Sequence, residues 1–108
     1  MDFKQIQLRA LQVREKYSAL EVKKNGQPWT NSQLMEGFVG DVGDLMKLVM
    51  AKEGARDIEN VAEKLAHELS DCLWCVLVLA KKYGIELETA FMKTMQELED
   101  RIAKEDKV

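Results

Sequence analysis

The sequence has few cysteines, one proline and no long apolar run. Its two cysteines, Cys72 and Cys75, are too few for the disulfide framework of a small secreted domain. The single proline, Pro28, leaves long stretches free to form helices. No apolar run approaches the roughly 20 residues that a membrane span needs, and the polar first residues do not resemble a signal peptide. These absences predict a cytoplasmic, helical protein that does not insert into membranes.

The chain also lacks an excess of positive charge. It has 16 Lys and Arg residues against 19 Asp and Glu residues, which gives a net charge of -3. A surface of this sign is unsuited to nucleic-acid polymers, although an acidic protein can still bind a small anion through a divalent metal ion. The 108 residues are predicted to form a single domain, residues 1–108.

Apolar residues recur every three or four positions, and no segment alternates with the period of a strand. This spacing predicts four helices, over about 2–22, 31–52, 57–83 and 87–104. Thr30 or Asn31 is expected to cap the second helix, and Gly54 and Gly84 to end the second and third. The predicted fold is all-α, an antiparallel four-helix bundle with short connections. The third helix has more apolar surface than one small bundle can hide, so at least a dimer is expected.

Four carboxylates lie in two pairs inside apolar helical stretches. Asp41 and Asp44 are three residues apart and share one helix face, as do Glu68 and Asp71 on the next helix. Four such groups together would repel one another unless a cation neutralised them, and oxygen ligands suit Mg²⁺ or Mn²⁺. The competing interpretation, solvated or salt-bridged helix faces, is about equally favoured by the spacing alone.

Two other metal chemistries are disfavoured by the sequence. A di-iron bundle needs Glu-x-x-His on two helices, but the single histidine, His67, has Lys64 three residues before it. A zinc site at Cys72-x-x-Cys75 lacks two further ligands, so both cysteines are expected to be small buried hydrophobes. His67 is expected either to support the acidic site or to satisfy a local hydrogen bond.

The acidic pattern resembles the MazG-like, all-α nucleoside triphosphate pyrophosphohydrolases. Their signature is Glu-x-x-Glu, a gap of about one to three dozen residues and then Glu-x-x-Asp. Here Asp41-x-x-Asp44 corresponds to the first half and Glu68-x-x-Asp71 to the second, with 23 residues between them. "GDVGDLMKL" is similar to the family's E-E-x-G-E-L stretch, and "HELSDCLWCVLVLA" to its E-L-x-D followed by an apolar run.

The resemblance implies Mg²⁺-dependent hydrolysis of nucleoside triphosphates to monophosphate and pyrophosphate, for removal of unwanted nucleotides, with Mn²⁺ as a possible substitute. Asp41, Asp44, Glu68 and Asp71 are implied as catalytic metal ligands, although Asp41 or Asp44 could instead position the attacking water. The resemblance further implies a homodimer or homotetramer whose sites form near the subunit contact.

Phosphate charge also needs donors, and a base needs a flat apolar wall. Four basic residues are candidates for phosphate binding, against the alternative of solvated helix faces: Lys47, Lys64, Lys93 and Arg101. Lys47 and Lys64 share helix faces with carboxylates, and the family uses basic residues of its last helix. Trp29 is the first candidate for base stacking, where relatives carry an aromatic residue, and Phe38 is the second. Trp74 is expected in the core.

The first half of the motif departs from the family pattern, because Asp replaces Glu at both positions. Aspartate is one methylene shorter, so either the helices approach more closely, or a water bridges the gap, or activity is weakened or lost. The alternative function is therefore a catalytically weak or inactive bundle that binds nucleotide or a protein partner. Gly37, Gly40 and Gly43 are expected either to permit a closer approach of the helices or to pack against bulky neighbours such as Trp74.

Overall fold

The computed structural model describes residues 1–106, so the last two residues of the predicted domain lie outside the described part. The described residues form α1 (Phe3–Asn25), α2 (Asn31–Lys52), α3 (Val61–Lys82) and α4 (Leu87–Asp106). The all-α prediction with four helices is confirmed for this part of the chain. None of these helices has the length and apolar character that crossing a membrane would require.

The ends of α2 follow from local sequence. The Thr30 hydroxyl accepts a hydrogen bond from the Gln33 N–H at 3.1 Å, and the Gln33 side chain accepts one from the Thr30 N–H at 2.9 Å. This capping box satisfies two backbone donors at the start of the helix. Gly54, just beyond the other end, has a φ of +86°, the left-handed conformation expected of a residue that follows a helix.

The third helix begins later than predicted. We expected it to start near Asp57, but it begins at Val61, because Asn60 has a left-handed backbone (φ 54°) that cannot continue a right-handed helix. α1 instead runs on to Asn25, beyond the predicted end at about residue 22. Its last turn contains Lys23 and Lys24, whose charges favour the C-terminal end of the helix dipole.

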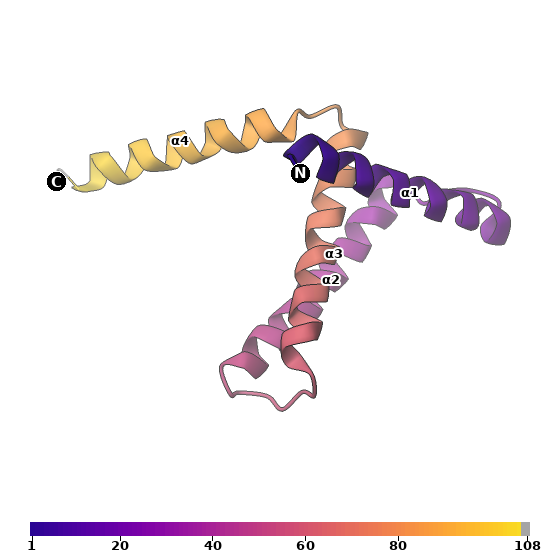
Figure 1. Cartoon of the computed structure of the whole chain (residues 1–108), viewed down its shortest axis with the longest axis horizontal. Coiled ribbons are helices and arrows are strands. Elements are labelled where there is room, and N and C mark those ends of the chain that lie inside the picture. The colour runs from indigo at the N-terminus through magenta and orange to yellow at the C-terminus, as the bar shows by residue number, and fades with distance from the viewer. Residues whose placement is uncertain (107–108) are drawn as a thin grey trace.

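α2 and α3 form an antiparallel hairpin, α1 lies across one end of α3, and α4 extends away (Figure 1). The small core lies mainly between α2 and α3, with one residue from α1: Ala10, Leu34, Leu48, Leu77, Val78 and Ala80. The half-buried Trp74 ties α3 to α1, because its Nε1–H donates to the Ala10 carbonyl at 2.9 Å. Within residues 1–106, α4 makes only scattered contacts with the other helices. The four helices of the described chain therefore do not pack into one closed bundle.

The glycines of α2 do not bring α2 and α3 together. A Cβ added at Gly40 or Gly43 would meet nothing within 4 Å, and one added at Gly37 would lie 3.5 Å from the Trp29 ring. The expectation that these glycines permit a closer helix approach is therefore wrong within the chain. The alternative of packing against a bulky neighbour holds for Gly37 alone, and that neighbour is Trp29 rather than Trp74.

We expect Gly40→Ala and Gly43→Ala each to raise the free energy of unfolding by about 0.5–1 kcal/mol. Alanine restricts the unfolded chain and favours helix, while its methyl group meets open space in both positions. Urea denaturation followed by circular dichroism measures the change. Gly37→Ala, whose methyl would touch Trp29, serves as the comparison and should gain less. A loss of stability at Gly40 or Gly43 would contradict the prediction.

Candidate functional site

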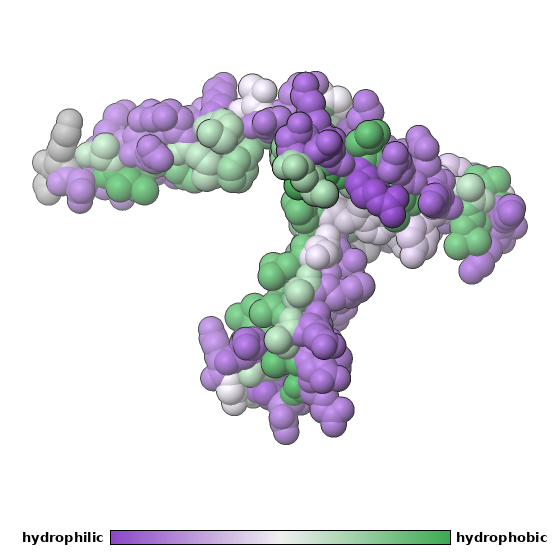
Figure 2. Space-filling model, viewed as in Figure 1, coloured by the Kyte–Doolittle hydropathy of each residue, from purple (hydrophilic) through white to green (hydrophobic). Residues whose placement is uncertain are grey.

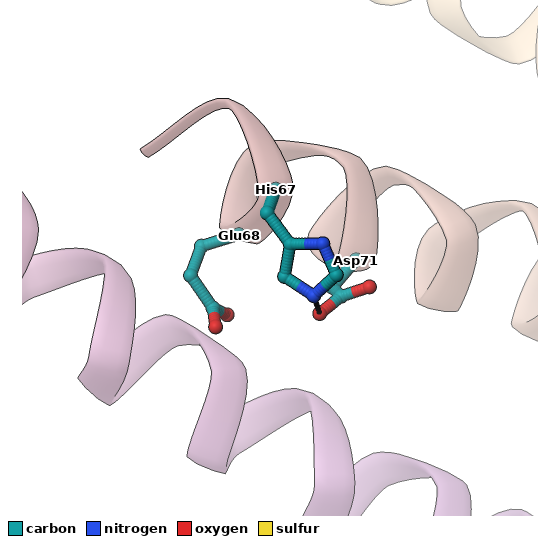
Figure 3. A group of neighbouring side chains, drawn as sticks. All are labelled: His67, Glu68 and Asp71. Atoms are coloured by element: carbon teal, nitrogen blue, oxygen red, sulfur yellow. Dashed lines mark ion pairs between the residues drawn. The ribbon is translucent and has the colours of Figure 1, made fainter. Parts of the chain in front are cut away.

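The α2–α3 hairpin brings three of the four predicted carboxylates together. Asp41 and Asp44 of α2 and Glu68 of α3 each offer an oxygen, and these oxygens lie within 4.8 Å of one another. Figure 3 shows the Glu68 carboxylate pointing from α3 toward α2. The two aspartates therefore come close to Glu68 despite their shorter side chains, without any help from the glycines.

The fourth carboxylate, Asp71, belongs to a neighbouring group with His67 and Glu68, whose ligand atoms also lie within 4.8 Å of one another. The His67 Nε2 lies 3.1 Å from the Asp71 Oδ2, one helical turn along α3 (Figure 3). The His67 side chain is 73% exposed and that of Asp71 is 33% exposed. His67 therefore makes the expected local interaction, and its partner is a predicted site residue.

Glu68 carries the least favourable charge of the cluster. Its Oε2 atom is buried and has no hydrogen-bond partner among the described residues. Burial raises the pKa of the Glu68 carboxyl, and the carboxylates of Asp71, Asp41 and Asp44 raise it further, in that order. A buried, unpartnered carboxylate oxygen facing two other acids is what a cation would stabilise, so the residues fit a divalent metal ion.

Cys75 supports the cluster in a way that the sequence did not indicate. Its Sγ lies 3.6 Å from the Asp41 Oδ2, within the range of a thiol hydrogen bond. Burial, followed by the neighbouring Asp41 carboxylate, raises the pKa of the Cys75 thiol to about 11. The thiol therefore stays protonated at neutral pH and donates to Asp41. Cys72 and Cys75 are free, and they are half-buried where we expected small buried hydrophobes.

A cavity of about 380 Å³ lies beside the carboxylates, between α2 and the start of α3. Asp44 and Glu68 line it on the acidic side, together with His67. Lys47 and Lys64, two of the predicted phosphate-binding residues, also line it. The cavity thus offers negative groups for a cation and positive groups for an anion within one space.

The other predicted site residues lie elsewhere. Lys93 and Arg101 are on α4, which extends away from the α2–α3 hairpin (Figure 1). The exposed Trp29 precedes α2, and its ring lies against Gly37, one turn before Asp41. Phe38 is half-buried on α2. A single chain therefore brings Lys47 and Lys64 to the carboxylates but not Lys93 and Arg101.

Comparison with known families bears on this arrangement. The model of the MazG nucleotide pyrophosphohydrolase domain matches residues 30–105, which is more than half of the chain. The chain belongs to the MazG family. The match spans α2, α3 and nearly all of α4, so every predicted carboxylate lies within it. Searches of curated proteins and of solved structures found no match.

The MazG match leaves out α1, where sequence reasoning missed two residues. Arg14 and Glu21 are 6% and 8% exposed and form an ion pair. Their spacing of seven puts them on one face of a helix, and their charges are opposite, which is the only indication that the sequence offers.

We expect Glu68→Gln to raise the free energy of unfolding of the metal-free protein at neutral pH, because the amide removes a charge that burial and three carboxylates disfavour. The folded state holds the Glu68 proton more tightly than the unfolded state does. Stability should therefore fall as the pH rises from about 4.5 through the raised pKa, and this fall should be smaller in the variant. Urea denaturation in EDTA across this range measures both effects.

The matched control is Glu15→Gln, at an exposed position of α1. It should leave both the stability and its pH dependence close to those of the original protein. If Glu68→Gln is no more stable than this control, Glu68 does not carry the charge cost that we assign to it.

Proposed function

We propose that this protein hydrolyses nucleoside triphosphates to monophosphate and pyrophosphate. The observation that carries the proposal is the gathering of Asp41, Asp44 and Glu68, with a buried unpartnered Glu68 oxygen, beside a cavity that contains Lys47 and Lys64. Membership of a family described as nucleotide pyrophosphohydrolases supports the same activity. The role would be to remove unwanted nucleotides from the pool.

Asp41, Asp44, Glu68 and Asp71 would hold Mg²⁺, for which Mn²⁺ would substitute. When bound, the ion would neutralise triphosphate charge and lower the pKa of a bound water. Cys75 donates to the Oδ2 of Asp41, which leaves Oδ1 free to act as a ligand. His67 orients Asp71 in the same manner through its Oδ2. Asp41 or Asp44 could alternatively hold the attacking water as a base.

The phosphate chain would lie in the cavity. Lys47 and Lys64 approach it from α2 and α3, so their ammonium groups can bind phosphate oxygens that the carboxylates would otherwise repel. Trp29 offers a flat, 43% exposed aromatic surface one turn from Asp41 for stacking with the base. Phe38, which is half-buried, is the second candidate for that wall.

We also propose that the working unit is at least a dimer. A compact monomer of 12.4 kDa exposes about 6,100 Å², whereas this chain exposes 8567 Å². Its radius of gyration is 17.4 Å, against about 13 Å for a compact chain of this length. The excess area of about 2,400 Å² is of the size that obligate partners bury.

Exposed apolar residues follow one side of α2 and one side of α4. Five exposed residues of α2 are spaced alternately four and three apart, as in a helix–helix seam: Met35, Val39, Val42, Met46 and Val49. Apolar side chains also cover one side of α4, and apolar side chains of the hairpin gather on the side that faces the open angle between α4 and the hairpin (Figure 2). Packing of α4 on a second copy would carry Lys93 and Arg101 toward that copy's phosphates, in a dimer or a tetramer.

Pyrophosphate release from the common ribo- and deoxyribonucleoside triphosphates, with Mg²⁺ or Mn²⁺, tests the activity. Turnover should depend on the metal, and Glu68→Gln should lower it by at least about 100-fold, the upper range for residues that merely support metal ligands. The control Glu15→Gln should retain full turnover. If no nucleotide yields pyrophosphate, the proposed enzymatic activity is refuted. Nucleotide binding without turnover would then favour the alternative, an inactive bundle that binds nucleotide.

Light scattering at micromolar concentration tests the assembly, and the expected mass is at least twice 12.4 kDa. The double variant Val39→Glu with Met46→Glu should lower the mass, because it places charges in the α2 seam. Gln12→Glu, on the exposed surface of α1, should leave the mass unchanged. A monomeric mass for the original protein would refute the dimer.

A further inference from the structure

α1 contains a buried ion pair that the proposed chemistry does not use. Arg14 and Glu21 are the buried charged residues of the described chain. The Arg14 Nη2 donates to the Glu21 Oε1, and the Arg14 Nε donates to the Ser18 hydroxyl at 3.3 Å. Both charges are thus paired within α1, two turns apart on the same face.

Stability alone does not explain this pair. Removing two charges from water costs several kcal/mol each, and well-packed apolar residues in place of a buried pair are often neutral or stabilising. The pair therefore needs another role, and its third contact indicates one. The Glu21 Oε1 also accepts a hydrogen bond from the backbone N–H of Trp29 at 2.8 Å. The pair thus reaches across the turn between α1 and α2.

That hydrogen bond fixes the residue that places an aromatic ring near the site. The Trp29 ring lies 3.5 Å from the position that a Gly37 Cβ would occupy, so one part of the indole rests on the α2 backbone. Gly37 precedes Asp41 by one helical turn. Trp29 is still 43% exposed, which leaves ring surface free for a ligand.

We infer that the Arg14–Glu21 pair is a positioning device for recognition of the nucleobase. Arg14 holds the Glu21 carboxylate, Glu21 holds the Trp29 N–H, and the indole is thereby kept beside Gly37 at a constant place relative to Asp41. The ligand is the base of a nucleoside triphosphate, which stacks on the free part of the indole. This inference rests on the proposed function, because only a nucleotide held at the carboxylates puts its base within reach of Trp29.

The device should affect binding of the base and not the chemistry at the phosphates. Stacking of a base on an aromatic side chain is worth about 5- to 150-fold in affinity. Loss of a fixed indole should therefore raise KM for nucleoside triphosphates by at least about 5-fold. The kcat should stay within about twofold, and so should inhibition by inorganic triphosphate, which lacks a base.

The double variant Arg14→Met with Glu21→Leu removes the pair without leaving a lone buried charge. Glu21→Asp is a milder second variant, because it keeps a negative charge opposite Arg14 but shortens the side chain whose oxygen accepts from the Trp29 N–H. The matched control is Glu15→Leu with Lys16→Met, at exposed positions of the same helix. Both test variants should raise KM as described, and the control should not. An unchanged KM, or a parallel loss of kcat and of triphosphate inhibition, would overturn the inference.

A second measurement does not depend on turnover. In a Trp74→Phe background Trp29 is the remaining tryptophan of the chain, so its fluorescence reports the indole alone. Acrylamide should quench Trp29 more strongly in both test variants than in the control, because the indole leaves Gly37. Equal quenching in all proteins would overturn the device even if the enzyme is active. Stronger quenching in a protein that releases no pyrophosphate would support the device and count against the proposed function alone.

Discussion

The packing of α2 against α3 creates the central constraint of this protein, a concentration of negative charge in a partly buried place. Three carboxylates from two helices come within 4.8 Å, and one Glu68 oxygen is left without a partner. The pKa of Glu68 is raised because burial and the neighbouring carboxylates disfavour its charged form. The best-packed pair of helices thus contains acidic groups that repel one another, an arrangement that a bound cation would stabilise.

Outside the contact between α2 and α3, many apolar side chains of the described residues remain exposed to solvent. The core contains few side chains, and long apolar stripes on α2 and α4 remain exposed. A helix that is apolar on two sides needs two neighbours, and within the described chain only α3 packs extensively against α2. The face of α2 that does not meet α3 therefore remains exposed as a result of the same helix geometry that forms the acidic cluster.

Several features could be predicted from the sequence because they depend on neighbours along the chain. Thr30 and Gln33 form the cap of α2, and Gly54 ends that helix, since both features are set within a few residues. The start of α3 was placed too early, because asparagine tolerates the left-handed backbone that Asn60 adopts but its residue type does not require it. The pairing of Cys75 with Asp41 was missed because it joins positions 34 residues apart.

The sequence by itself determined the helices, their order and the two pairs of carboxylates, because a period of three to four residues fixes which side chains share a face. Only the tertiary structure decided which of these faces meet. It joined Asp41 and Asp44 to Glu68, left Gly40 and Gly43 in open space and turned α4 away from the site. Such contacts depend on how whole helices pack against one another, which the local pattern of apolar residues does not specify.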